Sequence, residues 1–235
     1  MTADAGARVA FLPSLGRSPD DFAALMTAVV DAGYEAVPVA FTTDGVSTLH
    51  DLAAQAARAL GDGGPPAHLV GHALGNRIAR CLAADRPELV RSVTLLAAGG
   101  LVPPDDEAAA ALRNCFNVEL TPADHLAAVA TAFFAPGNDP SVWRGGWDGT
   151  LAAGQSSAVR ATDVEDWWTA GGTVPVLVIQ GLDDRVAPPA NGRDLVERIG
   201  ERARLVELAN AGHALLPEQP DAIAEALLEF LLSLR

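Results

Sequence analysis

Three short segments of the sequence carry residues that could act together chemically. Residues 71–75 read Gly-His-Ala-Leu-Gly, which keeps the pattern glycine-x-serine-x-glycine except that Ala73 stands at the serine position. A serine at the centre of this pattern is a nucleophile presented on a sharp turn between a strand and a helix. The second segment offers adjacent acids, Asp183 and Asp184, and the third offers His213. Because a carboxylate can hold a histidine in the tautomer that accepts a proton, the last two segments predict a general base.

Each of these segments follows a short apolar run rich in β-branched residues, which is typical of a buried strand. The predicted strands are Arg8 to Leu12, Glu35 to Phe41, Ala67 to Val70, Val90 to Ala97, Val174 to Ile179 and Arg204 to Leu208. Helical patterns follow from Ser18-Pro19 onward, Ser47 to Leu60, Leu74 to Ala84, Asn191 to Ile199 and Pro217 to Leu234. Strands that alternate with helices predict an α/β fold with a mostly parallel, doubly wound sheet of about six strands. The carboxyl ends of such strands form one edge, where ligands bind.

The alternation stops after Gly99-Gly100. Residues 103–172 contain helical and loop-like stretches and no convincing strand. This interruption predicts a helical lid over residues 103–172, inserted into a core made of residues 1–102 and 173–235.

The order of the three segments, with an acid and a histidine after the glycine-flanked turn, resembles the α/β-hydrolase superfamily. The resemblance extends from Arg8 to the end of the chain, and is strongest to small bacterial esterases, lactonases and cofactor-free haloperoxidases. It implies that Ala73 occupies the nucleophile position and that His213 is the base. It also implies that Asp184 is the acid, because members of the family place the acid three residues after the glycine that ends the strand.

The same resemblance implies an oxyanion hole, a pair of backbone N–H groups that binds the carbonyl oxygen. The expected donors are Leu74, which follows the nucleophile position, and Leu15, in the loop after the first strand. Many relatives have His-Gly where this chain has Pro13-Ser14. Because backbone amides donate whatever the side chain, the role of Leu15 does not depend on that difference.

The methyl group of Ala73 cannot form an acyl-enzyme. A laboratory serine-to-alanine change in an esterase or lactonase would explain it, and so would natural divergence, which the unusual Pro13-Ser14 pair favours. We expect a His213–Asp184 base that acts on a small apolar or aromatic carbonyl compound of the ester or lactone type. The same base could instead serve a lyase, a cyclase or a cofactor-free oxygenase. A pseudo-hydrolase that only binds its ligand is the remaining alternative.

The predicted lid contains most of the large aromatic side chains of the chain, which could either pack the lid onto the sheet or contact an apolar substrate. We predict that they contribute to substrate binding. They are Phe133, Phe134, Trp143, Trp147, Trp167 and Trp168.

The composition excludes several other functions. The chain has 235 residues with a net charge of −14, which argues against nucleic acid or an anionic membrane as a partner. All 16 basic residues are arginines, so a lysine Schiff base is excluded. Its histidines and two cysteines lack the spacing of a metal site, and we expect no metal, no organic cofactor and no disulfide framework. With no long apolar segment and no leader-like start, we expect a cytoplasmic protein that binds a small-molecule substrate, in an oligomeric state left open.

Overall fold

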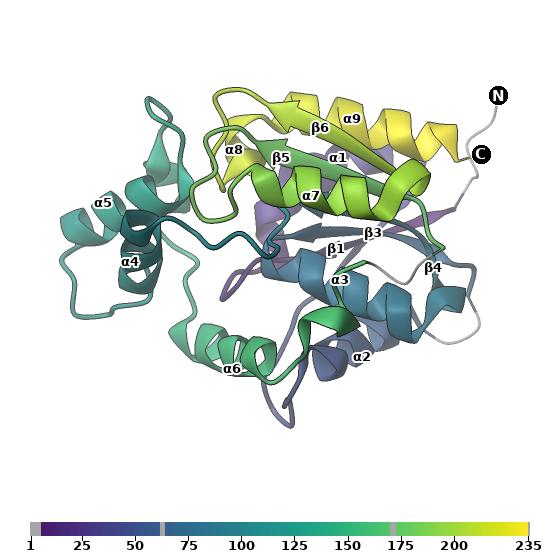
Figure 1. Cartoon of the computed structure of the whole chain (residues 1–235), viewed down its shortest axis with the longest axis horizontal. Helices are drawn as coiled ribbons and strands as arrows, with labels where there is room; N and C mark the ends of the chain where they lie inside the picture. Colours follow the sequence, from purple (N-terminus) through teal and green to yellow (C-terminus); the bar gives the residue numbers. More distant parts are fainter. Residues whose placement is uncertain (1–5, 62–63, 170–172, 235) are drawn as a thin grey trace.

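A computed structural model describes residues 6–61, 64–169 and 173–234. Six strands form one sheet (Figure 1). Their order is β2-β1-β3-β4-β5-β6, and every neighbouring pair is parallel. The strands are β1 (Arg8–Leu12), β2 (Glu35–Pro38), β3 (Ala67–His72), β4 (Val90–Leu96), β5 (Val176–Gly181) and β6 (Ala203–Leu208). The predicted fold class, an α/β protein with a parallel sheet, is therefore confirmed.

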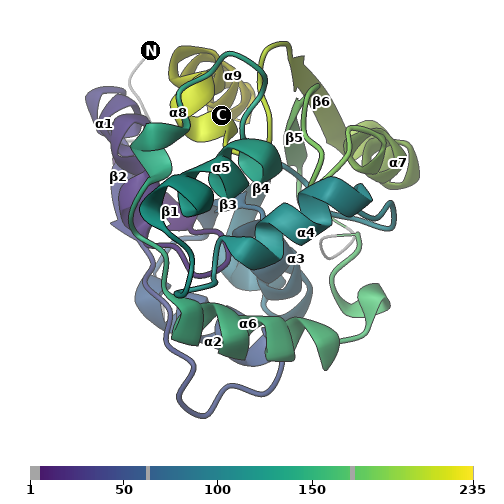
Figure 2. The same cartoon turned by 90° about the vertical axis from the view of Figure 1, so that its left-hand side faces the viewer.

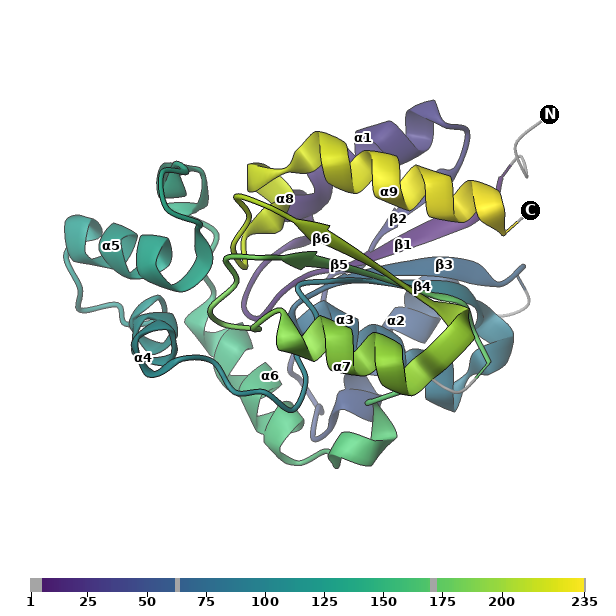
Figure 3. The same ribbon diagram turned by 45° about the horizontal axis from the view of Figure 1, so that its top comes forward.

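Helices cover both faces of the sheet (Figure 3). On one face, apolar residues of α1 (Ala23–Asp31) and α9 (Pro220–Ser233) pack against the strands. On the other face, α2 (Leu49–Leu60), α3 (Leu74–Asp85) and α7 (Ala190–Ile199) form a second core. Because β1, β3, β4 and β5 lie between these two layers, their residues are almost entirely buried, as a sheet buried on both faces requires.

Two predicted elements differ from their expected bounds. The strand expected over Glu35 to Phe41 ends at Pro38, on the edge strand β2, although the Val39 N–H still donates to the Phe11 carbonyl at 3.0 Å. The helix expected from Pro217 to Leu234 is two helices, α8 (Leu215–Glu218) and α9. Gln219 between them has φ −137° and ψ 52°, because the ring of a following proline disfavours helical backbone.

The segment between β4 and β5 is helical. It contains α4 (Asp106–Asn114), α5 (Pro122–Phe133) and α6 (Gly149–Arg160), and none of its described residues forms a strand. Helices α4 and α5 lie beyond the carboxyl ends of the strands, opposite the two chain termini (Figure 1), and α6 runs beside α2 (Figure 2). The last residues of the predicted lid, 170–172, lie outside the described residues. Nowhere in the described ranges is a helix long and apolar enough to span a bilayer.

Candidate active site

The turn from β3 into α3 has the shape of a nucleophile turn although it carries alanine. Ala73 has φ 50° and ψ −107°, a backbone conformation that side-chain-bearing residues rarely adopt. A Cβ on Gly71 would lie 2.4 Å from the backbone of Gly75, and one on Gly75 would lie 1.9 Å from the carbonyl oxygen of Leu12. Only glycine fits at either position, so the sequence pattern and the turn require each other.

The acid and the histidine meet at the carboxyl ends of β5 and β6. His213 Nδ1 lies 2.9 Å from Asp184 Oδ2, and both side chains are buried. The other oxygen of Asp184 accepts hydrogen bonds from the N–H groups of Val186 at 2.9 Å and Ala187 at 2.7 Å. The side chain of Asp183 is exposed instead. The geometry thus brings Asp184, and not its neighbour, to the histidine.

Gln180, which is not among the site residues predicted from the sequence, holds this carboxylate in place. Its Nε2 donates to Asp184 Oδ2 at 3.1 Å and to the Ala187 carbonyl at 2.7 Å, while its Oε1 accepts from the Ala98 N–H at 2.9 Å. The Gln180 side chain is fully buried, and both its amide oxygen and its amide nitrogen have hydrogen-bond partners. A glutamine inside an otherwise apolar strand is the sequence signal that could have revealed it.

The second ring nitrogen of His213, Nε2, is available to accept a proton. A carboxylate only accepts, so Nδ1 of His213 donates its proton to Asp184 and Nε2 is the acceptor. Nε2 makes no hydrogen bond to any residue in the described ranges. The His213 ring borders a cavity of about 310 Å³ that Ala73 also lines. The cavity is lined further by Ser14, Leu15, Leu74, Arg77, Ala97, Gly99, Leu112, Phe116, Phe133, Ser156, Val159, Arg160, Val186 and Ala187.

The two residues expected to supply the oxyanion donors border this cavity. Leu15 and Leu74 line it, and their N–H groups donate no hydrogen bond to the described part of the chain. The loop that carries Leu15 is fixed on its far side, where the Gly16 N–H donates to Gln155 Oε1 at 2.8 Å. Two backbone N–H groups of residues that line the cavity therefore have no hydrogen-bond partner in the described part of the chain.

A second histidine stiffens the site from behind. His72 is fully buried, and its Nε2 donates to the carbonyl of His213 at 2.8 Å. Burial lowers the pKa of His72 to about 3, so it is neutral near pH 7. Its role is to fix the His213 segment, since its ring does not border the cavity.

One of the six predicted substrate-binding aromatics, Phe133, borders this cavity, with its ring centroid 5.5 Å from that of His213. Trp143 and Trp147 instead hold the guanidinium of Arg17, at 4.5 and 4.6 Å from their ring centroids. Phe134 packs against Trp143 at 5.8 Å. Arg17 belongs to the loop after β1, so this group ties that loop to the insertion.

Trp167 and Trp168, which are also expected to contact the substrate, lie outside the lining of the cavity. They pack on α3, where the guanidinium of Arg80 lies 4.7 Å from the ring of Trp167 and 5.8 Å from that of Trp168. Neither tryptophan borders the cavity. They cover a buried arginine, which the sequence pattern could not reveal because Arg80 lies far from them along the chain.

Metal binding receives no support from the described residues, among which no three or more His, Cys, Asp or Glu side chains lie close enough together to hold an ion.

Comparison with known proteins agrees with this geometry. A sequence model of the alpha/beta hydrolase family matches residues 8–226. Rhodomycin D methylesterase DauP from Streptomyces sp. (strain C5) is 32% identical, with a match that covers 68% of this chain and 64% of that protein's length. The chain thus spans less than two thirds of that relative.

Solved structures show the same fold. The Rv0554 protein from Mycobacterium tuberculosis superposes with a TM-score of 0.80 at 25% identity, over 98% of this chain and 91% of that one. Esterase RhEst1 from Rhodococcus sp. ECU1013 gives a TM-score of 0.79 at 17% identity, over 100% and 94% of the two chains. From its sequence and its fold, this chain belongs to the alpha/beta hydrolase family.

Proposed function

We propose that this chain acts on a small apolar or aromatic carbonyl compound of the ester or lactone type, with the His213–Asp184 pair as general base and without a nucleophilic serine. The observation that carries the proposal is the unpaired Nε2 of a buried, carboxylate-bound histidine beside a cavity with two unused backbone donors. The similarity to a methylesterase supports an ester as substrate. The helices α4 to α6 act as the lid, since Leu112 on α4, Phe133 on α5 and Val159 on α6 line the cavity.

The chemistry follows from what each group can do. The substrate carbonyl oxygen accepts from the Leu15 and Leu74 N–H groups, which makes the carbonyl carbon electrophilic. His213 Nε2 takes a proton from a water molecule as its oxygen attacks that carbon. The imidazolium, stabilised by Asp184, then returns the proton to the leaving alkoxide oxygen. Water must be the nucleophile because Ala73 has no hydroxyl group.

The expected turnover is slow. Loss of the serine from a serine–histidine–acid triad costs on the order of 10⁶ in rate. The oxyanion hole and substrate binding that remain still exceed the reaction in water by roughly 10³ to 10⁴. A weak hydrolase activity that depends on His213 is therefore the signature of this proposal.

The test compares the hydrolysis of 4-nitrophenyl acetate and of a small lactone by the unchanged chain, by His213→Ala and by Asp184→Asn. General-base catalysis contributes roughly 10² to 10⁴, so His213→Ala should lower kcat/KM by about that factor and leave only what the oxyanion hole and substrate binding supply. His50→Gln is the matched control, because His50 is a partly exposed histidine paired with Asp85 and Asp166. Equal rates for the unchanged chain and His213→Ala would refute the proposal.

Proton removal from carbon is a second candidate, favoured by the absence of a hydroxyl at residue 73. The same base and amide donors could remove a proton next to a carbonyl and stabilise the enolate. Exchange of that proton for deuterium in D₂O, without ester cleavage, would identify this reaction. Incorporation of one ¹⁸O from labelled water into the acid product would identify hydrolysis.

A further inference from the structure

The charge of the cavity is opposite to that of the whole chain. The chain has 30 acidic residues and a net charge of −14. Among the described residues that line the cavity, however, none is acidic, and two are arginines, Arg77 and Arg160. A cleft lined by one sign of charge concentrates ligands of the opposite sign. This cavity therefore attracts anions, although the negative net charge of the whole chain repels them.

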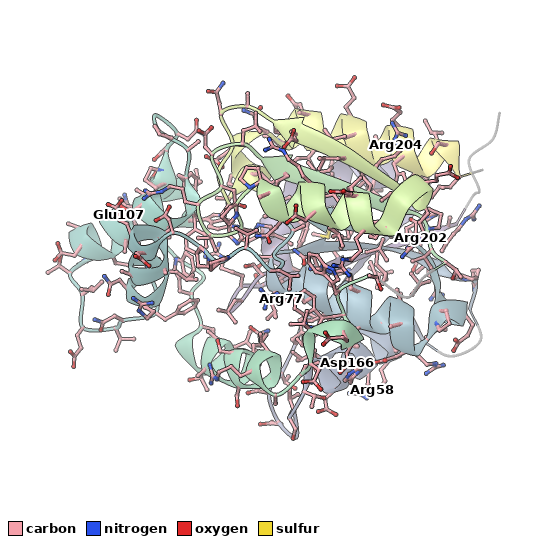
Figure 4. The ribbon with its side chains drawn as sticks, viewed as in Figure 1. Arg58, Arg77, Glu107, Asp166, Arg202 and Arg204 are labelled. Atoms are coloured by element: carbon pink, nitrogen blue, oxygen red, sulfur yellow. The ribbon has the colours of Figure 1, made fainter. Side chains whose placement is uncertain are left out.

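Arg77 is the better placed of the two. It lies on α3 one helical turn beyond Ala73, at the end of the helix near the insertion (Figure 4). Its guanidinium stacks 4.7 Å from the ring of Trp167 and is half-buried. Burial lowers the pKa of Arg77. No carboxylate or carbonyl of the described chain receives a hydrogen bond from it, so its N–H groups are unused.

Arg80, on the same helix, has a guanidinium that is hydrogen-bonded within the chain and so provides a comparison with Arg77. Arg80 is fully buried and donates to Asn76 Oδ1 at 2.7 Å and to the Gly99 carbonyl at 2.8 Å. Its pKa is lowered to about 9 by burial and by the positive charge of Arg77. Arg80 therefore has a structural role, and it adds to the positive potential at Arg77.

A desolvated cation beside a second cation is unfavourable unless an anion joins it. The planar fork of a guanidinium matches a carboxylate with two parallel hydrogen bonds. Contact with the Trp167 ring holds the guanidinium in place before any ligand arrives. The apolar remainder of the lining suits the hydrocarbon part of the same ligand.

We propose that this cavity takes a substrate that carries a carboxylate, which binds Arg77, with Arg160 adding attraction from the lid. The reactive carbonyl of that substrate would lie at the Leu15 and Leu74 N–H groups, and this second statement rests on the function proposed above. The binding of the carboxylate does not rest on it, because it requires no turnover.

The experiment is isothermal titration calorimetry with two probes of nearly equal shape, 4-phenylbutanoate and the neutral 4-phenylbutanamide. A hydrogen-bonded charge pair favours the acid by about 10-fold or more. Arg77→Gln should abolish this preference. Arg77→Lys keeps the charge but loses the fork, so it should retain a reduced preference. Arg58→Gln should leave the preference intact, because Arg58 is an exposed arginine on α2 (Figure 4) that does not line the cavity.

Equal binding of acid and amide, no binding of either, or an unchanged preference in Arg77→Gln would overturn the proposal. Arg77→Gln removes the packing on Trp167, so the urea unfolding midpoint of this variant is measured as well. If Arg77→Gln is unfolded, Arg77→Lys and Arg160→Gln take its place. Each of them should then reduce the preference for the acid. His213→Ala should keep the full preference for the acid. That variant separates the two proposals: hydrolysis fails there while the preference for a carboxylate remains.

Discussion

Replacing Ala73 by serine tests the whole site with one oxygen atom. The residue at this position already has φ 50° and ψ −107°, so serine adds no backbone strain that alanine does not have. The new hydroxyl would enter the cavity that His213 and the two amide donors border. We expect Ala73→Ser to gain esterase activity on small activated aryl esters, because serine then has a base to take its proton.

The size of the gain follows from which parts are in place. A complete site should recover most of the roughly 10⁶-fold that loss of the nucleophile costs. Each missing oxyanion donor would take about 10² to 10³ from it. The structure leaves both amides unused and holds Asp184 through Gln180, Val186 and Ala187, so we expect a gain of at least about 10³ over the unchanged chain.

The assay is kcat/KM with 4-nitrophenyl acetate, together with the burst of 4-nitrophenolate that an acyl-enzyme produces. Mass spectrometry should find the acetyl group on the peptide that contains position 73. Ala97→Ser is the matched control, because Ala97 also lines the cavity and has a positive φ of 54° but lies at the end of β4. That control should gain nothing.

The double change Ala73→Ser with His213→Ala should lose the gain, since serine without its base is a poor nucleophile. A folded Ala73→Ser protein with neither a burst nor turnover would refute the claim that only the hydroxyl is missing. Pro13 and Ser14, which precede the donor at Leu15, would then be the first residues to change.

Three further predictions concern stability. Ala73→Gly should raise the free energy of unfolding by about 1 kcal/mol, because relief of roughly 1–3 kcal/mol of backbone strain exceeds the entropic cost of glycine, about 0.5–1 kcal/mol; an unchanged or lower urea midpoint would show that the turn is not strained. Glu218→Ala should lower the free energy of unfolding by about 2–5 kcal/mol, because the Glu218 carboxylate accepts hydrogen bonds from the Ala135 and Gly212 N–H groups, each at 2.7 Å, and both donors would lose their partner. Glu225→Ala on α9 is the control and should leave the urea midpoint nearly unchanged. The free energy of unfolding should also fall as the pH drops from 6.5 toward about 3, because unfolded His72 takes up a proton in this window and folded His72 does not. In urea titrations at several pH values, the free energy of unfolding of His72→Gln should fall less steeply with decreasing pH than that of the unchanged chain. Equal slopes in the two proteins would contradict the lowered pKa of His72.

Much of the fold and part of the site could be predicted from local patterns. The strands and the turn at Ala73 follow from apolar periodicity and from two glycines that no other residue can replace. The proline at position 220, which separates α8 from α9, is likewise visible in the sequence. In each case the information lies within a few residues, where backbone sterics decide.

The contacts that shape the cavity could not be predicted in the same way. Trp167 covers arginines of α3, and Gln180 reaches from β5 to the carboxylate after it and to the end of β4. Such pairs depend on which helices and strands become neighbours, and a single sequence does not reveal this. The unpaired state of Arg77 is of this kind, since it follows only from knowing what surrounds it.

The strained turn at Ala73 also has a genetic consequence. All alanine codons have the form GCN, and each becomes a serine codon, TCN, by one base change. Because the turn at residue 73 and the His213–Asp184 pair are already in place, no intermediate sequence has to rebuild the backbone first. On the evolutionary landscape this chain and a serine esterase are then adjacent genotypes, so a library of random single-base mutants selected for ester cleavage should return the same codon repeatedly.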